Sequence, residues 1–175
     1  MPRPSSLWSA VSLLAAVLLV AAPTRAGVTI GEEAAAFTLP DAGGQPVTLA
    51  SLRGQIVILD FTASWCVACR TALPELERLG RRYAERGVVV VTVTIDAHRG
   101  DADRFLGEVV PGAAMRVLYD ATGQILARYG ASGMPAHYVL DRHGIVQLAA
   151  SGYTADRIAA IDAVVTRLLA ADPAP

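Results

Sequence analysis

Two cysteines separated by two residues, Cys66 and Cys69, constrain this chain most, and it has no other cysteine. The apolar run 56–62 precedes them and a helix-favouring run from Thr71 follows, so we expect the pair at the start of a helix that follows a buried strand. Free N–H groups and the positive end of the helix dipole stabilise a thiolate there, and the thiolate is the nucleophilic form of cysteine. Cys69 lies one turn further along the same face, where it can close a disulfide without backbone movement. The spacing therefore predicts a reversible dithiol–disulfide exchange site.

Length and charge narrow the class of protein. The chain has 175 residues, which is enough for one ordinary domain and too short for two comfortable ones. Its formal net charge of −1 leaves no electrostatic footprint for nucleic acid, so we expect no nucleic-acid partner.

Residues 1–26 have the order of a secretory signal peptide. Arg3 supplies a positive start, 7–22 is apolar, and Thr24-Arg25-Ala26 offers small residues at positions −3 and −1 for cleavage after Ala26. The apolar stretch is shorter than the roughly 20 residues that a membrane span usually needs, so cleavage is favoured over an N-terminal membrane anchor, which stays as the alternative. We expect the domain 27–175 to be exported to the periplasm or another oxidising, extracytoplasmic location.

The rest of the chain alternates between strand and helix patterns. An N-terminal hairpin is expected first, formed by 37–39 and 47–49 around the turn 41–44. Further strands are expected at 56–62, 88–95, 117–119, 136–140 and 145–150, and helices at 66–86, at 101–110 and after Thr154. The order β–α–β–α–β–β–α after the hairpin predicts an α/β fold, a thioredoxin-like three-layer sandwich with a central mixed sheet.

Three segments, 37–54, 60–70 and 129–144, carry motifs of a known family. They supply an entry hairpin, the Cys-x-x-Cys with a tryptophan before it, and a Gly-Met-Pro sequence downstream. Together they resemble the extracytoplasmic thioredoxin-like thiol–disulfide oxidoreductases of the TlpA/ResA type, which include the cytochrome c maturation reductases. The resemblance implies that the bond between Met134 and Pro135 is cis and lies opposite the dithiol.

Three positions distinguish this chain within that resemblance. Ala72 stands where many members of the family carry a glutamate, and Glu75 is not an obvious substitute. Asp60 stands where TlpA-type proteins often have asparagine and thioredoxin has a buried aspartate. Val67-Ala68, between the cysteines, is similar to the C-terminal domain of DsbD, a transmembrane reductant conduit.

The expected reaction assigns a role to three side chains. Cys66 attacks a partner disulfide, or its own disulfide is attacked, and a mixed disulfide forms. Cys69 then resolves that intermediate. Asp60 lies in the middle of an apolar strand, where an unpaired carboxylate is costly. We therefore expect Asp60 to relay the proton of Cys69, directly or through water.

The same pattern predicts how the partner is bound and in which direction the electrons move. Trp65 is expected to shield the disulfide, and Met134 and Pro135 to hold an extended partner segment by strand addition. Val67 and Ala68 offer only backbone N–H groups between the cysteines, so we expect a reductant. The predicted function is a periplasmic protein-disulfide reductase of the cytochrome c maturation or copper-site assembly type. Its partners would be an oxidised protein substrate and a membrane-embedded thiol electron donor, with no organic cofactor and no metal.

Other interpretations of the cysteines are weaker. A purely structural disulfide closing so small a loop would add little stability. A metal site would need His98, His137 or His143 as a third ligand, and no second Cys-x-x-Cys or paired histidine supports a closed zinc site. We expect His137 to be a strand residue facing solvent or a packed helix, and the other two to lie in loops. A thiolate pair can hold Cu(I), so a copper-handling chaperone stays as the alternative function. A peroxiredoxin is excluded because Ala63 replaces the threonine that family needs.

Overall fold

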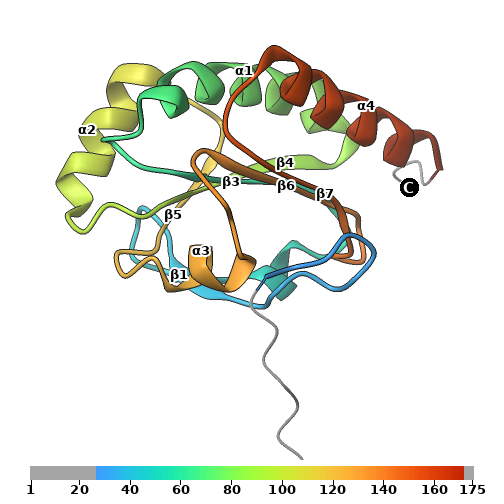
Figure 1. Ribbon diagram of the computed structural model, residues 1–175, viewed down its shortest axis with the longest axis horizontal. Coiled ribbons are helices and arrows are strands. Elements are labelled where there is room, and N and C mark those ends of the chain that lie inside the picture. The colour runs from blue at the N-terminus through green and yellow to red at the C-terminus, as the bar shows by residue number, and fades with distance from the viewer. Residues whose placement is uncertain (1–26, 172–175) are drawn as a thin grey trace, which may run out of the picture.

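The computed structural model describes residues 27–171, which form a three-layer α/β sandwich (Figure 1). The middle layer is a mixed sheet of five strands in the order β5–β4–β3–β6–β7. These strands are β3 (Ile56–Thr62), β4 (Val88–Thr94), β5 (Arg116–Tyr119), β6 (Ala136–Leu140) and β7 (Val146–Ser151). β4 is parallel to β3 and to β5, whereas β6 is antiparallel to β3 and to β7. The predicted thioredoxin-like fold with a mixed sheet is confirmed.

Helices and a hairpin cover the two faces of the sheet (Figure 1). The first face carries the helices α1 (Val67–Tyr83), α2 (Arg99–Val109) and α4 (Ala155–Ala171). The second face carries the hairpin of β1 (Thr38–Pro40) and β2 (Pro46–Thr48), the 3-10 turn η1 (Leu49–Leu52) and α3 (Gln124–Tyr129). The expected N-terminal hairpin is therefore present, as a separate two-stranded sheet. A further 3-10 turn, η2 (Ala84–Arg86), follows α1.

The central strand β3 is buried along its whole length because both faces of the sheet are covered. Successive side chains of a strand point to opposite faces. Ile56 and Ile58 pack in the apolar layer under α1 and α4, whereas Leu59 and Phe61 pack against the layer of the hairpin and α3. By the same alternation, Asp60 points into the layer under α1 and α4.

The order of the elements differs from the prediction at one place. After the hairpin the order is β–α–β–α–β–α–β–β–α. The strand expected at 117–119 is present as β5, although the predicted order omitted it, and the helix α3 was not predicted. α3 has six residues and lies between Gly123 and Gly130, both with positive φ. A segment of fewer than two turns is too short to show a helical repeat of apolar residues.

The predicted signal peptide, residues 1–26, lies outside the described residues. Within residues 27–171, no helix has both the length and the apolar character needed to cross a membrane.

Candidate active site

Cys66 and Cys69 form a disulfide at the start of α1, where the spacing predicted the pair. Their Cα atoms are 5.3 Å apart. Cys66 is the N-cap residue of α1, and its Sγ accepts a hydrogen bond of 3.2 Å from the backbone N–H of Cys69. After reduction, the same N–H group and the helix dipole would stabilise a negative charge on this sulfur. The structure therefore places Cys66 in the position that favours its thiolate.

Exposed apolar side chains flank the buried disulfide. Cys66 is 6% exposed and Cys69 is fully buried. Trp65 is 63% exposed and Val67 is 82% exposed, an uncommon arrangement for large apolar side chains beside a buried sulfur pair. A partner that reaches Cys66 therefore has to pass these two residues.

The Gly-Met-Pro segment precedes β6 and approaches the same site. The peptide bond between Met134 and Pro135 is cis. Pro135 is buried, and Met134 packs against the apolar cluster that contains both cysteines. The two residues before Met134, Ser132 and Gly133, are exposed. The segment thus packs Met134 against the apolar layer that holds the disulfide and leaves the residues before it open to solvent.

Asp60 lies on β3 directly opposite His137 on β6. The Oδ1 atom of Asp60 is 2.9 Å from Nδ1 of His137, and both side chains are almost completely buried. Of the two expected positions for His137, facing solvent or facing a packed helix, the structure shows the second, because His137 lies on the sheet face that the helices cover. Its pairing with Asp60 was not predicted, because it depends on the register of two strands distant in the sequence.

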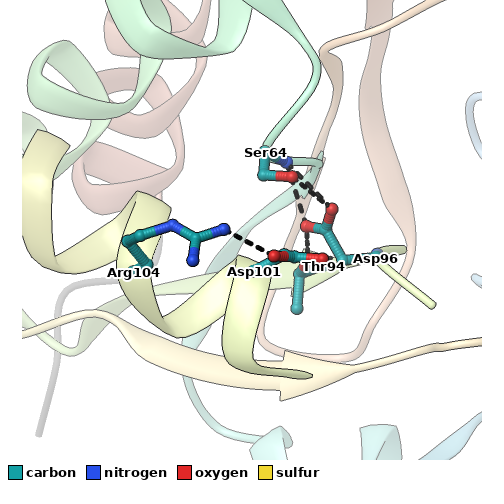
Figure 2. Close-up of polar contacts among 5 residues, drawn as sticks. All are labelled: Ser64, Thr94, Asp96, Asp101 and Arg104. Carbon is teal, nitrogen blue, oxygen red and sulfur yellow. Dashed lines mark hydrogen bonds and ion pairs between the residues drawn. The ribbon is translucent and has the colours of Figure 1, made fainter. Parts of the chain in front are cut away.

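Asp96, just after β4, holds the loop that leads to Cys66 (Figure 2). Its carboxylate accepts hydrogen bonds from the backbone N–H of Ser64 at 2.9 Å, from the Ser64 hydroxyl at 2.6 Å and from the Thr94 hydroxyl at 2.7 Å. Asp96 is 6% exposed, so these bonds lie largely out of water. They connect the carboxyl end of β4 to a residue two positions before Cys66. Sequence analysis missed Ser64 and Asp96, although a carboxylate directly after a buried strand is a signal that can be sought.

The remaining residues considered from the sequence lie away from the disulfide or make other contacts. His98 is exposed at the start of α2, and His143 is exposed in the turn between β6 and β7. Ala72 is buried in α1, and Glu75 pairs with Arg78 on the same helix. Within residues 27–171, no group of three or more His, Cys, Asp or Glu side chains is arranged to hold a metal ion.

The fold and the disulfide at a helix start define a thioredoxin-like thiol–disulfide protein. The chain belongs to the AhpC/TSA family, whose model matches residues 30–149. Thiol-disulfide oxidoreductase ResA of Halalkalibacterium halodurans is 26% identical over 163 residues, covering 88% of this chain and 92% of that protein. Thioredoxin-like protein YneN of Bacillus subtilis is 30% identical over 121 residues, covering 69% of this chain and 71% of that protein.

The solved structures agree with these relatives. A Chlorobium tepidum protein assigned as the thiol:disulfide interchange protein DsbE superimposes with a TM-score of 0.77 at 36% identity, covering 82% of this chain and 99% of that one. These comparisons support the TlpA/ResA type that the sequence motifs imply, and the enzyme is a thiol–disulfide oxidoreductase.

Proposed function

We propose that this oxidoreductase is an exported reductant of protein disulfides. The observation that carries the proposal is the N-cap position of Cys66, whose sulfur accepts the N–H of Cys69 while Cys69 itself is fully buried. This asymmetry supports a first attack by Cys66 and a resolving step by Cys69. Asp60 receives the proton of Cys69, directly or through water.

The reaction balances in two steps. The Cys66 thiolate attacks one sulfur of the partner disulfide, a new S–S bond forms, and the other partner sulfur leaves as a thiolate. Cys69 then loses its proton and attacks Cys66 Sγ, which releases the first partner sulfur and closes the Cys66–Cys69 disulfide. Two electrons pass from the dithiol to the partner. A membrane-embedded thiol donor would restore the dithiol.

The residues between the cysteines support the reducing direction. Stronger oxidants hold the thiolate with extra donors or charges, which makes the reduced form more stable. Val67 and Ala68 add neither, and the basic residue that follows, Arg70, pairs with Glu108 on the surface. Negative charge on the buried Asp60 would disfavour a thiolate further.

A redox titration tests the direction. The protein would be equilibrated in glutathione buffers and followed by the fluorescence of Trp65, the only tryptophan in residues 27–175. We expect a potential nearer the value of about −270 mV for thioredoxin than the value of about −120 mV for DsbA. A potential near the DsbA value would contradict the reducing role.

The exposed apolar residues at the site support a protein partner. Trp65 and Val67 on one side, and Met134 with Pro135 on the other, would hold an extended segment, which the exposed backbone before Met134 can pair by strand addition. Oxidised proteins of cytochrome c maturation or of copper-site assembly are the proposed substrates. Trapping with Cys69→Ala in the native cell would identify them, because this variant cannot resolve the mixed disulfide.

The proposed location rests on the N-terminal sequence pattern. We propose cleavage after Ala26 and export to the periplasm. N-terminal sequencing of the exported protein should give Gly27 or a residue close to it. A protein that starts at Met1 would instead support a retained N-terminal anchor.

A further inference from the structure

Asp60 and His137 form an acid–base pair inside an otherwise apolar layer. They are register partners of β3 and β6, and their Oδ1 and Nδ1 atoms are 2.9 Å apart with side-chain exposures of 1% and 0%. All four polar atoms, the two oxygens of Asp60 and the two ring nitrogens of His137, are buried, and none of them makes a hydrogen bond within residues 27–171. Each side chain therefore has the other as an ionisable neighbour.

The pair faces the same apolar layer as the redox disulfide. The neighbours of Asp60 and His137 on the same sheet face, Ile58 and Val139, belong to the apolar cluster that contains both cysteines. Cys69 is fully buried in that cluster. The first two turns of α1 carry no titratable group besides the cysteines and Arg70. Asp60 and His137 thus offer ionisable groups on the sheet side of this layer for a proton that leaves Cys69.

Other titratable groups on the covering elements are already engaged. α1 carries Glu77, which pairs with Arg81, and Tyr83, which donates to Asp162 of α4. Asp162 also pairs with Arg82. The strands beside the pair place Thr92 of β4 opposite Asp60 and Ala150 of β7 opposite His137, and neither residue titrates. The remaining groups near this layer are Asp96, which holds Ser64, and the half-buried Tyr153 before α4.

We infer that His137 is a positioning residue that keeps the Asp60 carboxylate in its proton-accepting form during the resolving step. A buried carboxylate without a partner tends to stay protonated, because the charged form is poorly solvated. The His137 imidazole, whose Nδ1 lies 2.9 Å from Oδ1 of Asp60, offsets that penalty electrostatically. Before this step, His137 stabilises the charge of the Asp60 carboxylate. Asp60 then takes the proton of Cys69 as Cys69 attacks Cys66 Sγ. This inference rests on the proposed reductase function.

Replacing His137 by leucine should leave the first attack unchanged and slow the second. Without the imidazole, the Asp60 carboxylate loses the group that stabilises its charge, so it accepts the proton of Cys69 less readily. We expect the resolving rate at pH 7 to fall by about tenfold or more, since positioned acid–base groups contribute about 10²–10⁴-fold. The rate should recover at high pH. The pH–rate profile should therefore shift to higher pH instead of dropping by the same factor at every pH. The mixed disulfide through Cys66 should accumulate at neutral pH.

The test is a stopped-flow and acid-quench series from pH 5 to 9 with the reduced full-length protein and insulin as the disulfide substrate. The variants are His137→Leu, Asp60→Asn and the double variant Asp60→Asn/His137→Leu. Because His137 acts through Asp60, the double variant should match Asp60→Asn in rate and in profile. This comparison stands even if His137→Leu alone does not fold, since the double variant contains no unpaired buried charge. Thr62→Val is the matched control, because it removes a buried, unpartnered hydroxyl from the same strand without changing a titratable group.

Two results would overturn the inference. One is a His137→Leu profile that coincides with that of the wild type. The other is a double variant that resolves more slowly than Asp60→Asn by a larger factor than the one by which Thr62→Val slows the wild type. Failure of the proposed function gives a different result: the wild type would reduce insulin no faster than Cys66→Ser at any pH.

Discussion

At the level of single residues, Cys66 and Cys69 differ although they are bonded to each other. Cys66 ends the loop and caps α1, whereas Cys69 lies within the helix and faces the sheet. The Cys66 sulfur has a backbone donor and borders the exposed residues Trp65 and Val67, whereas Cys69 is fully enclosed. The proposed order of the two thiols in the reaction therefore rests on their positions rather than on residue type.

The first prediction concerns this order. In the reduced protein, iodoacetamide should modify Cys66 at least about tenfold faster than Cys69, because a thiolate must be both formed and reached. Mass spectrometry of quenched samples would identify the modified residue, with Cys66→Ser and Cys69→Ser as single-thiol controls. Faster modification of Cys69 would show that the position at the helix start does not decide reactivity.

A second residue-scale prediction concerns the loop before Cys66. Asp96→Asn turns a carboxylate that accepts three hydrogen bonds into an amide, which presents N–H groups to some of those donors. Chemical denaturation should show a loss of roughly 1.5–3 kcal/mol in unfolding free energy.

The matched control for Asp96→Asn is Asp101→Asn, five residues along the chain. Asp101 pairs with Arg104 at the surface of α2 (Figure 2), and both side chains are well exposed. A surface pair in the first turn of a helix contributes at most about 1 kcal/mol, so the control should lose clearly less stability. Equal losses in the two variants would mean that Asp96 does not hold the loop.

At the level of elements, what the sequence could predict depends on how local its signal is. The Cys-x-x-Cys motif, the apolar strand before it and the β-branched run of β4 lie within short windows, and each was located from its own residues. α3 is too short for a repeat to show. The contacts between Asp60 and His137 and between Ser64 and Asp96 join different strands. A single sequence does not contain the register that brings them together, so these contacts could be found only in three dimensions.

Close packing between α1 and β4 gives the prediction at this scale. A Cβ atom added to Gly80 would lie 2.8 Å from Cγ2 of Val90, and Val90 is a stiff, buried, β-branched residue. Gly80→Ala should therefore destabilise the protein by about 1–3 kcal/mol in spite of the higher helix propensity of alanine.

Gly107→Ala in α2 is the control, because its added Cβ would have nothing within 4 Å. It should be neutral or more stable by up to about 1 kcal/mol. Thermal unfolding of both variants checks the pair. If Gly80→Ala gained as much stability as Gly107→Ala, the close approach of helix and strand would be contradicted.

At the scale of the whole molecule, the sheet separates two apolar layers with different contents. The layer under α1 and α4 holds the cysteines, whereas the opposite layer holds an aromatic cluster of Phe61, Tyr129 and Tyr138. Tyr129 donates to the backbone oxygen of Ala35, and Tyr138 donates to that of Tyr129. Burial raises the pKa of both phenols above the ordinary value of 10.0. These tyrosines tie the N-terminal segment to the sheet on the side away from the redox site.

This cluster predicts an alkaline limit of stability. An unfolded tyrosine loses its proton near pH 10, whereas the folded protein keeps the proton to higher pH because the folded pKa is raised. The contribution of the buried phenol to the free energy of unfolding is therefore full below pH 10. It is lost as the pH rises through the higher folded pKa. Tyr129→Phe keeps the ring and removes the ionisation. The variant should lose about 1 kcal/mol at pH 7, for the lost hydrogen bond, and show a shallower decline above pH 10. Denaturation at pH 7 to 11 measures both; parallel declines would contradict the role of the buried phenol.

The central claim is that Cys66 makes the bond to the partner and Cys69 breaks it, and one trapping measurement tests it most directly. Reduced wild type, Cys66→Ser and Cys69→Ala are each mixed with an equimolar protein disulfide such as insulin, quenched in acid and analysed by intact mass. The wild type should finish with the Cys66–Cys69 disulfide and reduced insulin, Cys69→Ala should stop at a mixed disulfide through Cys66, and Cys66→Ser should form none. A mixed disulfide in Cys66→Ser, or none in Cys69→Ala, would contradict the account.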